Sequence, residues 1–98
     1  MIKMFSALVY SEVSEIFKAL SDPTRLKILY SLYQGERGVG EIVAAVGLTQ
    51  SAVSHQLKQL RDKRLVKVRR EGKYAYYNLD DDHVRELLKI GFDHAVHE

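Results

Sequence analysis

The strongest constraint on the fold is a change of hydrophobic period within one continuous stretch, "VGEIVAAVGLTQSAVSHQLKQLRDKRLVKVRREGKYAYYNL". Its first part has the helical period of about 3.6 residues, which predicts a short helix over residues 41–46 and a second over about 50–63. Gly47 permits the positive φ of a tight turn, and Thr49 is a suitable N-cap for the second helix. Two helices joined by so short a glycine-containing turn are a helix-turn-helix.

The period then changes to two, which predicts a β-hairpin. Val66 and Val68 alternate with charged side chains, the chain turns at Glu71-Gly72, and β-favouring tyrosines return from Tyr74. A hairpin that directly follows a helix-turn-helix is typical of the winged helix-turn-helix fold. We therefore expect the hairpin to be the wing of such a domain.

The rest of the chain is predicted to be helical. A first helix fits residues 5–20, and a second follows Asp22 as its N-cap with Pro23 as its first residue. Asp80 is a suitable cap for a last helix that ends at about residue 96. No repeat or linker divides the sequence, so we predict one domain over residues 1–98, mainly α with a β-hairpin wing.

Composition excludes several classes of protein. The 98 residues suffice for one domain with a modest core, and a domain of this size often gains stability by dimerising. The sequence has no cysteine, which excludes disulfides, thiolate metal ligands and thiol redox chemistry. No apolar run approaches the roughly 20 residues that span a bilayer, and the N-terminus makes a poor signal peptide. We therefore expect a cytoplasmic protein.

Positive charge is concentrated between residues 50 and 74. This segment holds eight basic and two acidic side chains, whereas the rest of the chain holds seven basic and eleven acidic ones. A compact basic block in an otherwise acidic chain indicates a polyanion-binding surface, although charge alone fits a solvated face equally well. The tip of the hairpin, with Arg69, Arg70 and Lys73, would lie along the DNA backbone or in a minor groove, and such contacts supply affinity but little sequence information.

The helix over residues 50–63 has two distinct sides. At about 100° per residue, Val53, Leu57 and Leu60 fall together, and we expect them to face the core. The opposite side begins with small hydrogen-bonding side chains near the helix N-terminus, where a recognition helix meets base edges. The candidate DNA contacts on and beside this side are Gln50, Ser51, Ser54, His55 and Lys58. The alternative for the histidine is an ordinary exposed helix residue.

The last helix, "LDDDHVRELLKIGFDHAVHE", holds three of the four histidines. His83 and His94 are 11 residues apart, about 16 Å along a helix, which is too far for ligands of one ion. His94 and His97 are three residues apart and share a face. One chain therefore offers two half-sites, which an antiparallel partner helix would join into two equivalent sites. The alternative is structural, since the helix dipole also favours aspartates first and histidines last.

An apolar stripe on this helix supports such a partner. The stripe consists of Val84, Leu87, Leu88, Gly91, Phe92 and Ala95.

Three imidazoles and one carboxylate suit four-coordinate Zn(II), with Co(II) as a surrogate. Spacing favours Asp80 as the carboxylate, because Asp81 lies about 200° from His83 on an ideal helix.

Two blocks, "FKALSDPTRLKILYSL" and "LTQSAVSHQLKQLRDKRLVKVRREGKYAYYNL", strongly resemble the ArsR/SmtB family of bacterial metal-responsive repressors. The resemblance extends over about residues 13–97. It implies a homodimer formed through the first and last helices. It also implies that operator DNA is contacted by the matching positions Gln50, Ser51, Ser54 and His55.

A zinc-sensing branch of this family has an Asp-x-His…His-x-x-His ligand set on its last helix. The family's other metal site uses a cysteine pair on the helix that here reads "GEIVAAV", so thiolate sensing of arsenic, lead or cadmium is not expected. The resemblance thus implies a ligand set at the matching positions Asp81, His83, His94 and His97.

These observations lead to one hypothesis and two alternatives. The hypothesis is a repressor that binds an imperfect inverted repeat of operator DNA as a metal-free homodimer and is released by Zn(II) at the dimer interface. One alternative is a winged-helix regulator of the same fold that responds to another signal, such as Ni(II), Co(II) or a non-metal ligand. The other, a zinc enzyme, is disfavoured because four protein ligands leave no open coordination position.

Overall fold

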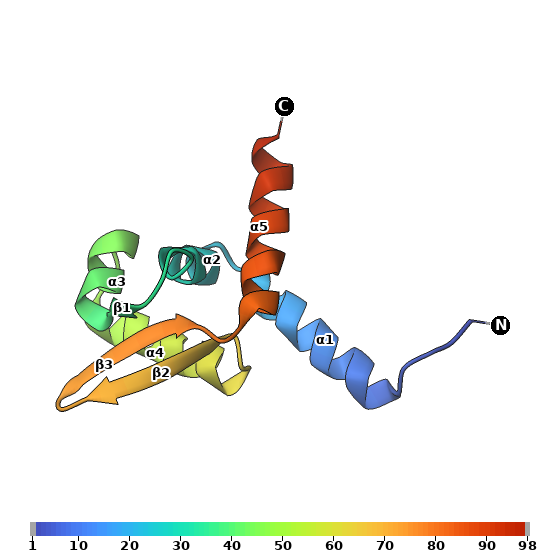
Figure 1. Ribbon diagram of the computed structural model, residues 1–98, viewed down its shortest axis with the longest axis horizontal. Coiled ribbons are helices and arrows are strands. Elements are labelled where there is room, and N and C mark those ends of the chain that lie inside the picture. Colours follow the sequence, from blue (N-terminus) through green and yellow to red (C-terminus); the bar gives the residue numbers. More distant parts are fainter. Residues whose placement is uncertain (1, 98) are drawn as a thin grey trace.

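The computed structural model describes residues 2–97, as five helices and a three-stranded antiparallel sheet (Figure 1). The helices are α1 (Ala7–Leu20), α2 (Pro23–Ser31), α3 (Val39–Val46), α4 (Gln50–Asp62) and α5 (Asp82–Val96), and the strands are β1 (Arg37–Gly38), β2 (Val66–Glu71) and β3 (Tyr74–Leu79). The predicted fold class, mainly α with a β-hairpin wing, is confirmed. Between residues 2 and 97, no helix is long and apolar enough to cross a membrane.

The helix-turn-helix of α3 and α4 forms where the sequence predicts it. Gly47 ends α3 in the left-handed region, with φ of 74°. The Thr49 hydroxyl oxygen accepts a hydrogen bond from the backbone N–H of Ala52 at 3.1 Å, which satisfies one free donor at the start of α4. The inward side of α4 is fully buried, as predicted, at Val53, Leu57 and Leu60.

The hydrophobic core lies between α2, α3, α4 and the sheet. Burying one large aliphatic side chain stabilises a fold by about 1.5–3 kcal/mol, so these residues fix the relative positions of the elements. Beyond the three side chains of α4, the largest fully buried ones are Ile28, Leu29, Leu32, Ile42, Leu65 and Val66.

The sheet has the strand order β1-β3-β2, so the hairpin is joined at one edge by a short strand that the sequence pattern does not predict. Two residues are too few to show a period of two, and β1 exists only because Arg37 pairs with Tyr77 of β3. The two-residue hairpin loop lies at Gly72-Lys73, one residue later than the pattern predicts, since Glu71 pairs with Tyr74. Gly72 supplies the positive φ, 59°, that such a loop requires.

Two helices begin at residues other than those predicted. α1 begins at Ala7 rather than residue 5, because the Ser6 hydroxyl accepts a hydrogen bond from the backbone N–H of Val9 at 3.4 Å. α3 begins at Val39 rather than residue 41, directly after β1. Its first turn is capped in part by the Glu41 carboxylate, which accepts from the backbone N–H of Gly38 at 3.1 Å.

The cap of α5 is Asp81 and not Asp80, which corrects the expectation from sequence. The Asp81 carboxylate accepts a hydrogen bond from the backbone N–H of Val84 at 3.2 Å. Asp80 instead donates its backbone N–H to the carbonyl of Leu65, at 3.0 Å, which joins the start of α5 to the segment after α4. The helix therefore begins one residue later, at Asp82.

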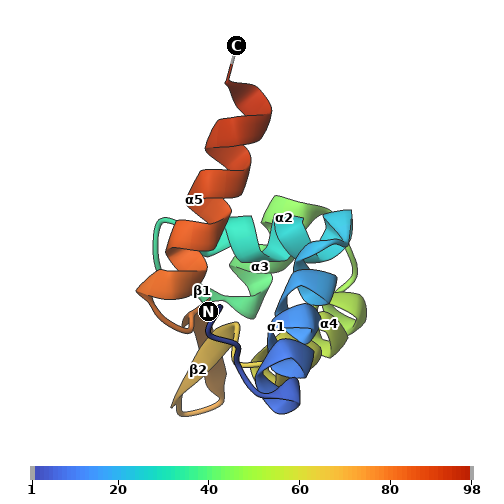
Figure 2. The same ribbon diagram turned by 90° about the vertical axis from the view of Figure 1, so that its right-hand side faces the viewer.

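Two helices project from the body of the domain. Figures 1 and 2 show α1 extending to one side and the second half of α5 rising above α2 and α3. The radius of gyration is 14.8 Å, whereas a compact domain of this length has about 13 Å. Phe17 of α1 is 55% exposed and Ile90 of α5 is 63% exposed, although both are large and apolar.

α4 ends in a strained conformation at Arg64. This residue has φ of 58° and is the one non-glycine residue between 2 and 97 with positive φ. It allows the backbone N–H of Leu65 to reach the carbonyl of Leu60 at 2.9 Å, which closes the helix. A side chain with a Cβ in this region costs about 1–2 kcal/mol relative to its right-handed alternative.

We expect Arg64→Gly to raise the free energy of unfolding by about 0.5–1 kcal/mol, because relief of the Cβ clash exceeds the entropy cost of glycine. Urea denaturation measures the change. Gly47→Ala is the opposite control, since it adds a Cβ at φ of 74°, and should lower the stability by about 1 kcal/mol. If the urea midpoint of Arg64→Gly is at or below that of the wild type, the backbone of Arg64 is not strained.

Candidate functional site

The outward side of α4 presents a continuous polar surface to solvent. All five α4 residues predicted to contact DNA, namely Gln50, Ser51, Ser54, His55 and Lys58, are exposed. The Gln59 amide lies 3.3 Å from the ring Nε2 of His55, which orients the imidazole along the helix. The surface begins at the N-terminus of a helix, where free backbone N–H groups and the helix dipole favour anions.

Contacts at the middle and at the end of α4 join it to the neighbouring helices. The Arg25 guanidinium of α2 donates to the side-chain oxygen of Gln56, in the middle of α4, at 3.1 Å. Directly after α4, the Lys63 ammonium lies 2.8 Å from the Glu15 carboxylate of α1. The Lys63 side chain lowers the pKa of Glu15 through this hydrogen bond. The polar side of α4 is therefore connected to both α1 and α2.

The wing and the start of α4 share a surface hollow of about 430 Å³. Gln50 lines it from α4, and Lys73 and Tyr74 line it from the wing. One predicted helix contact, Gln50, and one predicted wing contact, Lys73, therefore lie around the same hollow, although they are more than 20 residues apart in the sequence. The sequence did not indicate Tyr74, which is 59% exposed and lies beneath the Lys73 ammonium.

The three predicted wing cations differ in their surroundings. Arg70 and Lys73 are exposed and form no ion pair within residues 2–97. Arg69 instead forms ion pairs with Glu36 and Glu71, which the sequence did not indicate. The hydrogen bond from Arg69 lowers the pKa of Glu36, so the pair stays charged. Sequence reasoning missed this pairing because Glu36 lies 33 residues away and no local pattern marks it.

The first predicted metal half-site consists of Asp81 and His83 at the start of α5. The Asp81 carboxylate oxygen Oδ2 lies 3.3 Å from His83 Nδ1. Asp81 precedes the helix, so the ideal-helix angle that disfavours it does not apply. The backbone N–H of Val84 lowers the pKa of Asp81 through its hydrogen bond, and His83 lowers it further, so the carboxylate is ionised and able to bind a cation.

The second half-site lies at the far end of the same helix. His94 is in the last turn of α5, and His97 is the residue after the helix, with extended backbone at φ of −71° and ψ of 132°. Because His97 lies outside the helix, the backbone does not force His94 and His97 onto one face, as their spacing predicts for two helical residues. Between residues 2 and 97, no three potential ligands lie close enough to hold one ion.

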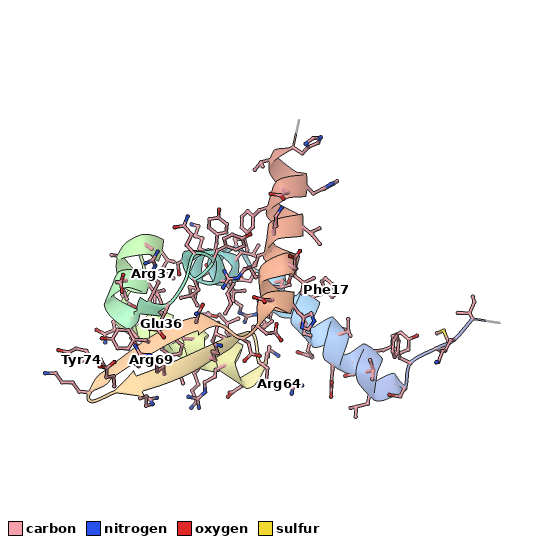
Figure 3. The ribbon with its side chains drawn as sticks, in the orientation of Figure 1. Phe17, Glu36, Arg37, Arg64, Arg69 and Tyr74 are labelled. Carbon is pink, nitrogen blue, oxygen red and sulfur yellow. The ribbon has the colours of Figure 1, made fainter. Side chains whose placement is uncertain are left out.

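The apolar stripe of α5 is divided between two roles. Val84 and Leu88 are buried in the core of their own chain, which corrects the expectation that the whole stripe faces a partner. Leu87, Gly91 and Ala95 instead line an open groove of about 330 Å³. The other residues that line the groove are Phe17 and Leu20 of α1, Leu26 of α2, and Leu88 and Phe92 of α5. Figure 3 shows Phe17 where α1 meets α5.

A third hollow, of about 330 Å³, connects the first half-site to the recognition helix. It is lined by Asp81 and His83 at the start of α5 and by Lys63 and Arg64 at the end of α4. The start of α5 and the end of α4 therefore lie on opposite sides of one hollow.

The architecture and the polar helix face define the class of the protein as a winged helix-turn-helix. Residues 22–68 match the model of the "Bacterial regulatory protein, arsR family". The chain is 46% identical over 83 residues to the "Transcriptional repressor SmtB homolog" of Synechocystis, a match of 85% of this chain and 63% of that protein. It is 42% identical over 84 residues to a "Cadmium resistance transcriptional regulatory protein CadC homolog" of Staphylococcus aureus, 85% of this chain and 69% of the relative.

A solved structure supports the same assignment. The homodimeric winged helix-turn-helix DNA-binding domain of a possible ArsR-family regulator from Mycobacterium bovis superposes with a TM-score of 0.84 at 33% identity. The match covers 100% of this chain and 96% of that one. The chain belongs to the ArsR family, which is a family of transcriptional regulators and not of enzymes.

Proposed function

We propose that this protein is a dimeric repressor that binds operator DNA when metal-free and releases it when Zn(II) binds between the two α5 helices. The observation that carries the proposal is the pair of half-sites on one helix, which are too far apart to serve one ion within a chain. The relatives named as SmtB and CadC homologues are a repressor and a cadmium-resistance regulator, which supports a metal signal.

Binding to DNA is supported by the exposed polar side of α4 and by the charge of the wing. Gln50, Ser51, Ser54 and His55 are suited to base edges, while Lys58, Arg70 and Lys73 are suited to phosphates. In a dimer, two such surfaces would meet successive major grooves, so the operator should be an imperfect inverted repeat. The protein would act in the cytoplasm, where the chromosome lies.

A second copy of the chain is the partner proposed for the apolar surface of α1 and α5. The chain exposes 7298 Å², whereas a folded monomer of 11.3 kDa exposes roughly 5,700 Å². The excess is about twice the 800 Å² that each partner contributes to an interface of standard size. Much of it is apolar, on α1 and on the free half of α5. The Mycobacterium bovis neighbour is named as a homodimer.

The donor geometry supports zinc and favours Asp81 over Asp80. Two ligand atoms of a tetrahedral Zn(II), each about 2.0–2.1 Å from the ion, lie roughly 3.3 Å apart. The separation of Asp81 Oδ2 and His83 Nδ1 is 3.3 Å. An antiparallel α5 from the partner would bring its His94 and His97 to the same place and complete four ligands. When bound, Zn(II) would hold the two α5 helices in one relative position.

The release of DNA would follow from the attachment of α5 to α4. Asp80 is hydrogen-bonded to Leu65, and Asp81 and His83 face the end of α4 across a shared hollow. A change in the angle between the α5 helices would therefore change the distance between the two recognition helices. The coupling must be reciprocal, so operator DNA would weaken zinc binding by the same factor.

We expect Zn(II) to weaken DNA binding by about 5- to 150-fold in the wild type. The measurement is fluorescence anisotropy of a labelled duplex that the wild-type protein selects from a random library. His97→Ala and Asp81→Asn should bind the duplex normally and lose the response to zinc. Asparagine caps helices as well as aspartate does, so Asp81→Asn removes the charge and preserves the start of α5.

Because the imidazoles must be neutral to bind metal, the response should fade below about pH 6. If zinc leaves the affinity of the wild type unchanged, the sensing proposal fails, although DNA binding by the protein would still stand.

We expect Phe17→Asp to abolish the dimer, because it places a charge in the apolar groove between α1 and α5. Sedimentation velocity measures the oligomeric state and circular dichroism verifies the helix content. The zinc affinity of the monomer should fall although every ligand is intact. Ser11→Asp adds the same charge to the side of α1 that carries Glu15 and should remain dimeric. A Phe17→Asp dimer with wild-type zinc affinity would contradict the proposed interface.

We expect Ser54→Ala combined with His55→Ala to weaken binding to the selected duplex by about tenfold or more, since a good hydrogen-bonded pairing with a base edge is worth about 1–3 kcal/mol. Both residues are exposed, so the thermal midpoint should stay unchanged. Ser14→Ala on α1 is the matched control and should bind normally. Wild-type affinity in the double variant would show that this side of α4 does not contact the bases.

A further inference from the structure

Arg69 of β2 is held by two carboxylates. Its Nη2 and Nε lie 2.9 Å and 3.1 Å from the two oxygens of Glu36, which is a two-pronged ion pair. Its Nη1 lies 2.6 Å from a carboxylate oxygen of Glu71. Figure 3 shows Arg69 and Glu36 close together along the wing, with Tyr74 farther toward the tip.

The side chain of Arg69 crosses the whole sheet. Arg69 lies opposite Tyr76 of β3, and its guanidinium carbon is 4.7 Å from the centre of the Tyr76 ring. Glu36 directly precedes β1, which is the strand at the other edge of the sheet. Two strand spacings separate these edges by roughly 9.5 Å, so Arg69 joins the outermost strand of the wing to the segment that follows α2.

The wing needs such a connection. Val66, Tyr77 and Leu79 anchor the inner half of the hairpin in the core, whereas the outer half contributes only the half-buried Ala75. β1 supports the hairpin with only two residues. Apolar packing therefore holds the outer half weakly, and this half carries Arg70 and Lys73.

The charge of Arg69 is already compensated. To contact a phosphate, its guanidinium would have to leave two carboxylates, one of which is bound in a two-pronged geometry. Arg70 and Lys73 have no such competitor within residues 2–97. Within residues 2–97, the wing therefore contains three exposed cations without an ion pair, namely Lys67, Arg70 and Lys73, and one, Arg69, that is committed to the protein.

We propose that Arg69 is a positioning residue that latches the wing to Glu36, and that Arg70 and Lys73, rather than Arg69, provide the phosphate contacts at the tip of the wing. This inference rests on the proposed binding of DNA. The alternative is that Arg69 itself contacts a phosphate and that Glu36 merely holds it when DNA is absent.

Glu36→Gln separates the two roles, with Glu71→Gln as the matched control. Both substitutions remove one negative charge beside Arg69, which by itself strengthens DNA binding. Only Glu36 lies across the sheet, since Glu71 is on the same strand as Arg69. With a latch, Glu36→Gln weakens binding to the selected duplex by roughly three- to tenfold, whereas Glu71→Gln does not weaken it. Binding by Glu36→Gln that equals or exceeds that of Glu71→Gln would overturn the proposal.

Arg69→Lys gives an independent test. Lysine keeps the charge and binds phosphates, but it cannot form the two-pronged pair or lie flat on Tyr76. A latch predicts that Arg69→Lys loses as much affinity as Glu36→Gln, and that combining the two substitutions costs little more than either one. Wild-type affinity in Arg69→Lys, or independent losses in the combined variant, would assign Arg69 to the DNA instead.

Amide hydrogen exchange tests the latch without DNA. The backbone amides of β2 and β3 should exchange about threefold or more faster in Glu36→Gln than in Glu71→Gln, while the amides of α4 remain protected in both. If the wild type selects no duplex, the proposed function fails, and the exchange rates still decide the latch. Equal wing exchange in the two variants would overturn it.

Discussion

Burial of Val53, Leu57 and Leu60 organises the whole domain. Because these side chains occupy one side of α4, the polar residues on the other side must face solvent as one surface. The chain leaves α4 through the strained residue Arg64 and enters the core again at Leu65 and Val66, which places the wing beside the same surface. The candidate DNA contacts of the helix and wing are thus positioned by apolar packing that touches no DNA.

A single chain leaves a large apolar surface on α1 and α5 exposed to solvent. Val84 and Leu88 anchor the first half of α5 to the core, and the Arg85 guanidinium donates to the Tyr33 carbonyl of the segment after α2. In the second half of α5, Phe92 packs against the Tyr30 ring, but Ile90 is exposed, as is Phe17 on α1. In the proposed dimer, the helix that completes the interface also carries the candidate metal ligands, so assembly and sensing would depend on the same surface.

Local patterns explain why much of the fold could be predicted from the sequence. Gly47, Thr49 and the two hydrophobic periods act over a few residues, and the structure confirms the helix-turn-helix and the hairpin that they predict. Strand β1 and the hydrogen bond of Asp80 could not be predicted in the same way, because Arg37 pairs with Tyr77 and Asp80 with Leu65, both distant in sequence. The exact cap of α5 and the hairpin loop were each misplaced by one residue, because neighbouring residues offer similar caps and turns. For the candidate site, the sequence indicated the exposed side of α4 but not the commitment of Arg69 to Glu36.

The order of residues along α4 was enough to separate its buried side chains from its exposed ones, because helical periodicity is a property of neighbouring residues. Residue spacing also established that the histidines of α5 cannot all serve one ion in one chain, since the rise of a helix per residue is constant. Which charges remain free depended instead on how distant segments pack together. Arg69 and Arg70 are adjacent in the chain and identical in chemistry, yet one spans the sheet to Glu36 and the other faces solvent, because strand side chains alternate between opposite faces.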